Sequence, residues 1–236
     1  MRIRRWLQQW CELCSIFFDW MHILWHIMRG AWKMTRLPQP RVTFFGGARV
    51  MQDSQHAKGA HELARRLAAT GVSIVTGGGP GIMEAANCGA YEAVKGSGRI
   101  ASMGIGVDHL PGEQKINACA QEFIVLHHFF ARKWLLINYS IGFVIFPGGF
   151  GTLDEFSEVI TLIQTKKLKQ VPIILFNTEY WKLLIQWIHE TAIAHGMIPQ
   201  EDADLVVVTD DFDEIFCLLR DQCDAYRAKK NSQKPT

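Results

Sequence analysis

Glycine-rich segments are the part of this sequence best suited to binding a phosphate group. Gly46-Gly47, residues 77–81 and residues 148–152 each follow a short run of β-branched or aromatic residues that predicts a strand. Glycine lets the backbone approach a ligand closely, and the N–H groups that open a following helix bind anions. One such loop is equally consistent with a tight turn. Two of them at one edge of a sheet favour a phosphate site.

Charged residues flank the last of these segments. Thr152 is followed by Asp154 and Glu155, which we expect in the first turn of a helix, where a simple capping role is the alternative. Arg132-Lys133 begins a helix that leads into the fifth predicted strand, and an ordinary surface pair is the alternative there. A cation pair near an anion-binding loop and a carboxylate predicts a site for a phosphate and a ribose.

Several other functions are disfavoured. Ile82 stands where the GxGxxG pattern needs its last glycine, and no GxxxxGK[ST] segment occurs, so NAD and nucleoside-triphosphate enzymes rank lower. The 25 Lys and Arg residues against 23 Asp and Glu leave a formal charge of +2, which does not indicate a nucleic-acid-binding surface. We therefore expect no nucleic-acid partner.

The six cysteines are scattered and follow no cleavable secretory signal, so we expect reduced thiols and no disulfide. Cys11, Cys14, His22 and His26 form a CxxC–HxxxH pattern that resembles a zinc site. One rigid helix would not wrap four such ligands around an ion, so we set this site aside. No metal or cofactor is expected.

The elements that must position these residues alternate between strands and helices. The 236-residue length suits one large domain at residues 41–228, followed by a polar tail at 229–236. The predicted strands span residues 42–45, 72–76, 99–105, 122–126, 141–146, 171–176 and 205–209. Seven strands separated by helices predict an α/β fold, a Rossmann-like doubly wound parallel sheet whose glycine loops share the carboxyl edge.

Residues 1–36 differ in character from the rest and hold five of the eight tryptophans. Polar residues recur every three or four positions, which predicts an amphipathic helix with a narrow polar face, joined to the domain by a Pro-rich linker at 37–40. Asp19, His22 and His26 interrupt any membrane span. Burial in a subunit interface ranks first, peripheral membrane contact second and spanning third. With no signal-peptide cleavage site, we expect a cytoplasmic protein.

The glycine loops also resemble a known family. Residues 147–155 are similar to the PGGxGTxxE signature of the lonely-guy phosphoribohydrolases, residues 76–87 to the second motif of that family, and Ala131-Arg132-Lys133 to its RK pair. The resemblance covers about residues 41–219. Residues 44–49, 110–114 and 162–165 resemble the larger bacterial subgroup in particular.

This resemblance implies hydrolysis of the N-glycosidic bond of a nucleoside 5′-monophosphate, of the AMP or cytokinin riboside monophosphate type, to a free base and ribose 5-phosphate. It implies Arg132 and Glu155 as the catalytic pair and a homodimer or higher homo-oligomer. The implied substrate-binding residues are Lys133, Gly78, Gly79, Gly81, Glu84, Asn87, Gly148, Gly149, Gly151 and Thr152. A role in bracing the preceding loop is the alternative for Glu84. Gly47 replaces a serine usual in the bacterial subgroup, and residues 104–111 also depart from it, which leaves base specificity open.

Three other functions compete with this one. Family members have been labelled lysine decarboxylases, but the sequence lacks a Ser/Thr-x-His-Lys segment for a pyridoxal Schiff base, so we reject that activity. A non-catalytic nucleotide-binding or molybdenum-cofactor carrier protein is the main alternative, because such carriers share the PGGxGT loop. A membrane-recruited interaction protein, in which the Trp-rich helix is the functional part, is the second alternative.

Overall fold

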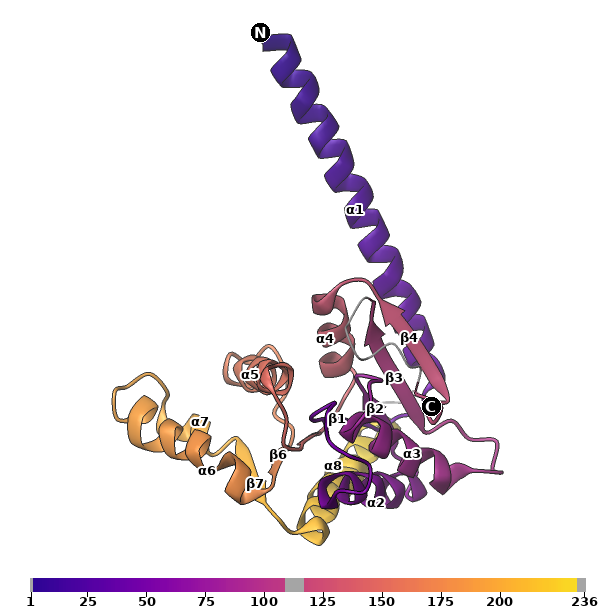
Figure 1. The fold of residues 1–236 in the computed structure, drawn as a ribbon, viewed down its shortest axis with the longest axis vertical. Coiled ribbons are helices and arrows are strands. Elements are labelled where there is room, and N and C mark those ends of the chain that lie inside the picture. The colour runs from indigo at the N-terminus through magenta and orange to yellow at the C-terminus, as the bar shows by residue number, and fades with distance from the viewer. Residues whose placement is uncertain (1, 109–116, 233–236) are drawn as a thin grey trace.

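A parallel sheet forms the centre of the protein (Figure 1), in a computed structural model that describes residues 2–108 and 117–232. The spatial order of the strands is β4-β3-β2-β1-β5-β6-β7, and every pair is parallel. The strands are β1 (Arg41–Phe45), β2 (Ser73–Thr76), β3 (Ser102–Val107), β4 (Glu122–Leu126), β5 (Phe143–Ile145), β6 (Ile173–Phe176) and β7 (Val206–Thr209). The predicted seven-stranded α/β fold is confirmed.

Helices connect the strands and cover both faces of the sheet. They are α1 (Arg2–Arg36), α2 (Gln55–Ala69), α3 (Ile82–Val94), α4 (Phe129–Asn138), α5 (Phe150–Gln164), α6 (Thr178–Trp187), α7 (Gln200–Ala203) and α8 (Phe212–Ser232). A π-helical turn, Ile188–Ile193, extends α6. Because α8 continues through Ser232, residues 229–232 of the predicted polar tail are helical.

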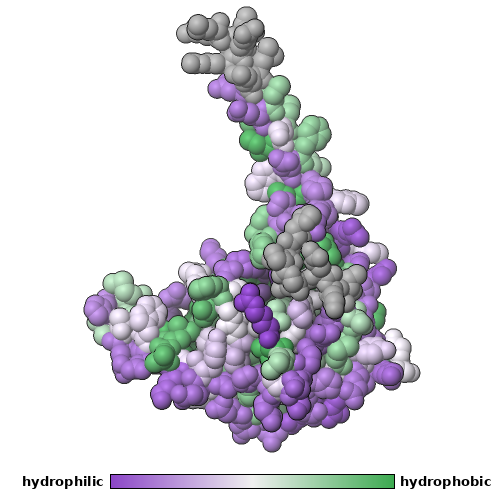
Figure 2. Space-filling view, in the orientation of Figure 1, coloured by the Kyte–Doolittle hydropathy of each residue, from purple (hydrophilic) through white to green (hydrophobic). Residues whose placement is uncertain are grey.

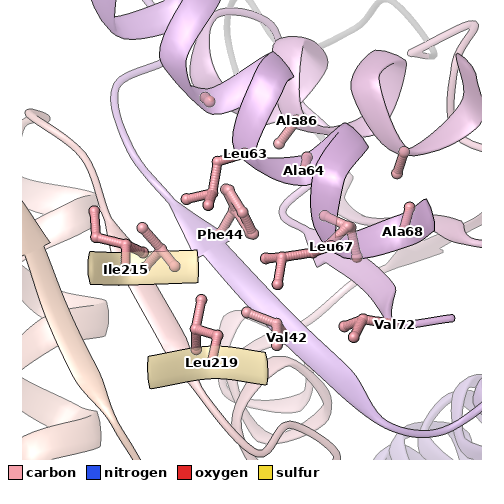
Figure 3. Close-up of a cluster of buried hydrophobic side chains, with 14 of the residues drawn as sticks. Val42, Phe44, Leu63, Ala64, Leu67, Ala68, Val72, Ala86, Ile215 and Leu219 are labelled. Carbon is pink, nitrogen blue, oxygen red and sulfur yellow. The ribbon is translucent and has the colours of Figure 1, made fainter. Parts of the chain in front are cut away.

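Two hydrophobic clusters lie on opposite faces of the sheet. Alternate residues of β1 show the division, since Val42 and Phe44 join one cluster and Phe45 the other. Figure 3 shows the first cluster, in which α2 and α8 cover Val42 and Phe44. The second cluster includes residues of α4, α5 and the end of α1. Both faces of the sheet are buried, as a doubly wound sheet requires.

The two halves of the sheet diverge between β1 and β5. From β1 the chain proceeds outward through β2, β3 and β4 on one side, then returns to β5 and continues through β6 and β7 on the other. At such a switch point the loops that follow the two central strands leave in opposite directions and open a crevice at the carboxyl edge. The segments after β1 and β5 are two of the predicted glycine loops.

Helix α1 has a docked half and a projecting half. Met34 and Leu37 are buried in the second cluster, and the Arg41 guanidinium donates hydrogen bonds to both of their carbonyl oxygens at 2.6 Å. Farther toward the N-terminus, α1 extends away from the body with apolar and polar residues both exposed (Figures 1 and 2), including Trp6 and Trp10. Among the described residues, no helix combines the length and apolarity needed to cross a membrane.

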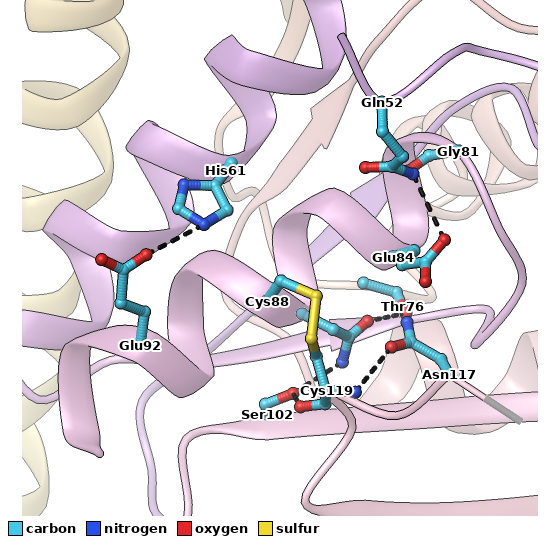
Figure 4. The surroundings of a disulfide bond; sticks show 11 residues. Gln52, His61, Thr76, Gly81, Glu84, Cys88, Glu92, Ser102, Asn117 and Cys119 are labelled. Carbon is cyan, nitrogen blue, oxygen red and sulfur yellow. Dashed lines mark hydrogen bonds and ion pairs between the residues drawn. A yellow bond between two sulfur atoms is a disulfide. The ribbon is translucent and has the colours of Figure 1, made fainter.

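The prediction of reduced cysteines throughout is wrong for one pair. Cys88 of α3 and Cys119, which precedes β4, form a disulfide (Figure 4). The two residues are 31 positions apart, so their proximity depends on how α3 packs beside the β3–β4 connection, which spacing along the chain does not show. Cys11, Cys14, Cys217 and Cys223 are free thiols, as expected.

Candidate functional site

Three glycine loops meet at the carboxyl edge of β1, β2 and β5. The backbone N–H of Gly47, after β1, donates to the carbonyl of Pro147, after β5, at 3.0 Å. The N–H of Ile82, at the start of α3, donates to the carbonyl of Gly47 at 3.2 Å. The loop after β1 therefore links the other two, and the predicted gathering of these loops at one edge is observed.

Close backbone packing explains some of these glycines without any ligand. Gly81 has a φ of 69°, and a Cβ there would lie 2.3 Å from the carbonyl oxygen of Gly47. Gly78 also has a positive φ, of 77°. A Cβ at Gly148 would lie 2.2 Å from Oγ1 of Thr152. These three glycines are required by the fold itself, as in a tight turn that binds no ligand.

Gly149 and Gly151 differ, because a Cβ at either position would meet open space. Gly149 is the N-cap of α5, and Gly149 and Gly151 are both exposed. The first N–H groups of a helix lack partners within the helix and carry its positive dipole end. The start of α5 is therefore an accessible position for a phosphate.

Helix α5 begins earlier than expected. It starts at Phe150, so Thr152 lies within the first turn, where it is buried, and its first turn holds no acidic residue. Asp154 and Glu155 fall in the second turn, which corrects their expected place at the helix start. A capping role for these two carboxylates is excluded by this shift, because the dipole effect is confined to the first turn.

Arg132 and Glu155 come from different helices. Arg132 lies on α4 and is only 6% exposed, and its Nη2 is so close to Gly77 that a Cβ there would approach it to 2.1 Å. Its guanidinium thus packs against the backbone of the loop after β2. Glu155 lies on α5 and is partly buried. The fold thus places the Arg132 guanidinium against the loop after β2. It places the Glu155 carboxylate in the second turn of α5, just beyond the loop after β5.

Lys133 connects α4 to α5 through ion pairs. Its Nζ lies 2.7 Å from Glu158 and 3.2 Å from Asp154, both on α5. Burial acts to lower the pKa of Lys133, but its hydrogen bonds to Glu158 and Asp154 outweigh that effect and raise the pKa. Lys133 therefore stays charged and holds together the two helices that carry Arg132 and Glu155.

Asn87 is fully buried behind the second glycine loop. Oγ1 of Thr76 donates to its Oδ1 at 2.5 Å, and its Nδ2 donates to Oγ of Ser102 at 2.8 Å. The N–H of Gly78 in turn donates to Oγ1 of Thr76 at 3.0 Å. Asn87 thus shapes the loop from within, through the hydroxyl groups of Thr76 and Ser102, whose roles the sequence pattern does not reveal.

Glu84 and Tyr180 contact the loops at their edges. Gln52 donates from Nε2 to the carbonyl of Gly81 at 2.9 Å and to Glu84 at 3.3 Å (Figure 4), an arrangement that matches the bracing role. The Tyr180 hydroxyl, from α6, donates to the carbonyl of Gly148 at 2.5 Å. Sequence reasoning missed Gln52 and Tyr180, because neither belongs to a glycine loop or a charged pair.

Comparison with known proteins places the chain in a family. The profile described as "Possible lysine decarboxylase" matches residues 83–219, more than half of the chain. A protein of Oryza sativa subsp. japonica named "Probable cytokinin riboside 5′-monophosphate phosphoribohydrolase" is 32% identical over 174 residues, covering 72% of this chain and 73% of that protein. The chain belongs to the lonely-guy family.

Other relatives and solved structures agree with this family and fold. The cytokinin riboside 5′-monophosphate phosphoribohydrolase of Rhodococcoides fascians is 26% identical over 78% of this chain and 91% of its own length. The solved structure of the molybdenum-cofactor-binding protein of Rippkaea orientalis superposes on this fold with a TM-score of 0.54. The match covers 78% of this chain and 97% of that protein, at 21% sequence identity. At that identity the structural similarity concerns the fold alone.

Proposed function

We propose that this lonely-guy family member is a nucleoside 5′-monophosphate phosphoribohydrolase. Water would add to C1′ of the ribose, the C1′–N bond to the base would break, and the base would leave with a proton. The products are a free base and ribose 5-phosphate. The observation that carries this proposal is that two helices bring three groups to one glycine-rich edge of the sheet. They are the accessible start of α5, the carboxylate of Glu155 on the same helix, and the guanidinium of Arg132 on α4, which packs against Gly77.

Each group has a role that suits its chemistry. The open N-terminal turn of α5, with Gly149, Gly151 and Thr152, would bind the 5′-phosphate through backbone N–H groups. Ribosyl C–N cleavage passes through an oxocarbenium-like state, which a nearby carboxylate stabilises, and Glu155 would supply it and orient the water. Arg132, fixed against Gly77, would hold the phosphate or ribose in a reactive pose.

Substrate identity rests on relatives as well as on the site. Proteins of Oryza sativa, Rhodococcoides fascians and Arabidopsis thaliana that share 26–32% identity with this chain are named for cytokinin riboside 5′-monophosphate. We extend the proposal to AMP, whose base lacks only the N6 substituent of such nucleotides. Gly47, which stands in place of the usual serine, is adjacent to this edge and is our candidate for a difference in base preference.

The deciding experiment is a panel of nucleoside 5′-monophosphates, each paired with its nucleoside, incubated with the purified full chain. Chromatography of the base and an assay for ribose 5-phosphate measure turnover. We expect cleavage of AMP or an N6-substituted analogue and no cleavage of the matching nucleosides. Equal turnover of AMP and adenosine contradicts a phosphate-binding role for α5. Absence of turnover across the panel, together with tight nucleotide or molybdenum-cofactor binding, favours the carrier alternative.

A further inference from the structure

Three histidines from two separate elements meet where α1 passes the end of β4. His22 and His26 lie one turn apart on α1, and His127 is the first residue after β4. One ligand nitrogen from each ring lies within 4.8 Å of the other two. The Nε2 atoms of His22 and His26 are 3.1 Å apart, and the ring of His127 stacks on that of His22 with centroids 5.4 Å apart.

We propose that His22, His26 and His127 bind a divalent transition-metal ion, with Zn²⁺ as the preferred occupant. Imidazole nitrogen is a favoured ligand for Zn²⁺, Cu²⁺ and Ni²⁺. With Zn–N bonds of 2.0–2.1 Å, tetrahedral geometry places the ligand nitrogens about 3.3 Å apart. The spacing of the His22–His26 pair already fits this value. His22 and His127 are exposed, so small ring rotations bring the third nitrogen into range.

Asp108 completes the site in the manner of a supporting carboxylate. Its Oδ2 lies 3.1 Å from Nδ1 of His127. Asp108 and His127 directly follow β3 and β4, whose last residues, Val107 and Leu126, are paired in register. A carboxylate that accepts a hydrogen bond from Nδ1–H fixes the orientation of the ring and leaves the lone pair of Nε2 available to a metal. This carboxylate–histidine pairing is typical of metal-binding histidines.

The positions of the three ligands are fixed by a series of contacts between α1 and β4. Arg36 pairs with Glu122 at 3.5 Å, and Nζ of Lys33 donates to the carbonyl of Phe123 at 2.7 Å. Toward its N-terminus, α1 runs alongside β4 toward the end of that strand, and this direction leads from these contacts to the histidine cluster. Ligands held on a helix and directly beside the end of a strand need little reorganisation to bind an ion.

The cysteines of the CxxC segment do not belong to this site, because Cys14 lies eight residues before His22, about 12 Å along a helix. The third ligand comes from a distant element, which the spacing in α1 does not reveal.

The test uses the untagged full chain carrying Cys11→Ser, Cys14→Ser and Cys217→Ser, so that the exposed thiols do not bind the ion. Titration with Co²⁺, followed by its visible absorption and by competition with Zn²⁺, measures stoichiometry and affinity. We expect one ion per chain. His26→Gln and His127→Gln should each weaken binding at least about tenfold, and Asp108→Asn about tenfold. His189→Gln, which alters an exposed histidine of the π-helical turn, is the matched control and should bind as the parent does.

A second readout distinguishes a real site from loss of folding. Hydrogen–deuterium exchange of residues 22–36 should slow when Zn²⁺ is added to the parent, because the ion ties α1 to the end of β4, and should not respond in His127→Gln. Circular dichroism verifies that each variant is folded. Absence of saturable Co²⁺ binding in the parent, or equal binding by the parent and the His26→Gln and His127→Gln variants, overturns the proposal. Its outcome does not depend on any hydrolase activity.

Discussion

At the scale of single residues, the candidate chemistry depends on two charged groups whose surroundings differ. Arg132 is almost fully buried against the Gly77 backbone, whereas Glu155 is partly buried on a helix whose start is open. Lys133, next to Arg132, is committed to ion pairs with α5. The two neighbouring cations therefore have different roles: Arg132 packs against the glycine loop, and Lys133 links α4 to α5.

Replacing Glu155 by Gln tests the proposed carboxylate directly. The side chain keeps its shape but loses the charge that stabilises the oxocarbenium-like state, so kcat should fall by about two to four orders of magnitude. Steady-state release of free base from AMP measures the effect. Asp154→Asn is the matched control, because it removes the adjacent carboxylate while Lys133 keeps Glu158, and its kcat should stay within about threefold of the parent. A near-parental rate for Glu155→Gln would transfer the role to another carboxylate, with Glu84 next to be tested.

The cysteines provide a second test at this scale. Without reductant, a thiol reagent should label Cys11, Cys14 and Cys217 in the native protein, and Cys223 only after unfolding. Burial raises the pKa of Cys223 from 9.0 to about 12, so little thiolate forms in the fold. Mass spectrometry of labelled peptides identifies the sites. Cys88 and Cys119 should react only after reduction. Native labelling of Cys88 would contradict the disulfide.

The same pKa shift predicts how stability depends on pH. The folded pKa of Cys223 lies above the unfolded value, so its contribution is fully present below pH 9 and is lost as pH rises from about 9 to 12, where the unfolded chain ionises first. Urea unfolding at pH 8 and pH 10.5 measures this. Cys223→Ala, compared at the same two pH values, should show a smaller decrease. An equal decrease in both proteins would attribute the pH effect to other groups.

At the scale of elements, a glycine in these loops serves either close backbone packing or access for a ligand. The sequence pattern alone does not distinguish the two roles. Gly81 is required by a positive φ and by contact with Gly47, whereas Gly151 faces open space at the start of α5. Substituting each by alanine distinguishes packing from ligand binding. Gly81→Ala should lower the free energy of unfolding by about 1–3 kcal/mol, because the residue is strained and meets a carbonyl oxygen.

Gly151→Ala should leave stability intact and weaken substrate binding, the reverse of what Gly81→Ala tests. Alanine is favoured over glycine within a helix, so thermal stability should be kept or slightly raised. A methyl group beside the proposed phosphate position should raise KM for AMP by about tenfold or more. Thermal unfolding and steady-state kinetics on the same preparation measure both effects. A parental KM for Gly151→Ala would exclude the first turn of α5 as the phosphate site.

Sequence patterns predict the strands well because the sheet is buried on both faces and leaves continuous β-branched runs. Glu122–Leu126 matches its predicted bounds, and the other strands differ only at their ends. The glycine loops are equally visible. Contacts between elements that are distant in the chain are not visible in the sequence, because they depend on packing. Examples are the Cys88–Cys119 disulfide, the hydrogen bond from the Tyr180 hydroxyl to Gly148, and the approach of His127 to α1. The sequence places the start of α5 too late, because Thr152 resembles an N-cap, whereas the N-cap of the helix is Gly149.

At the scale of the whole molecule, α1 is the element whose apolar side the rest of the fold leaves largely uncovered. Its end is part of the core through Met34 and Leu37, yet Trp6, Trp10 and Trp20 are each more than half exposed. A row of large exposed apolar side chains such as this one usually marks a contact with another protein or a lipid surface. The docked half also means that a deletion up to Arg41 would remove core residues together with the projecting half, so a finer truncation is needed.

A chain that starts at Met21 retains the docked half and removes the exposed residues before it, including Trp6, Trp10 and Trp20. We expect this truncation to lower the oligomeric mass measured by light scattering, because the first-ranked role of the projecting half is to cover its apolar side with another copy of the chain. Thermal stability should change little, since Met34 and Leu37 remain in place. Trp6→Ser/Trp10→Ser in the full chain is the matched control for length and should shift the mass in the same direction. Sedimentation with anionic liposomes tests the membrane alternative. If the truncated chain keeps the parental mass but loses liposome binding, the projecting half is a membrane contact and the interface prediction is wrong.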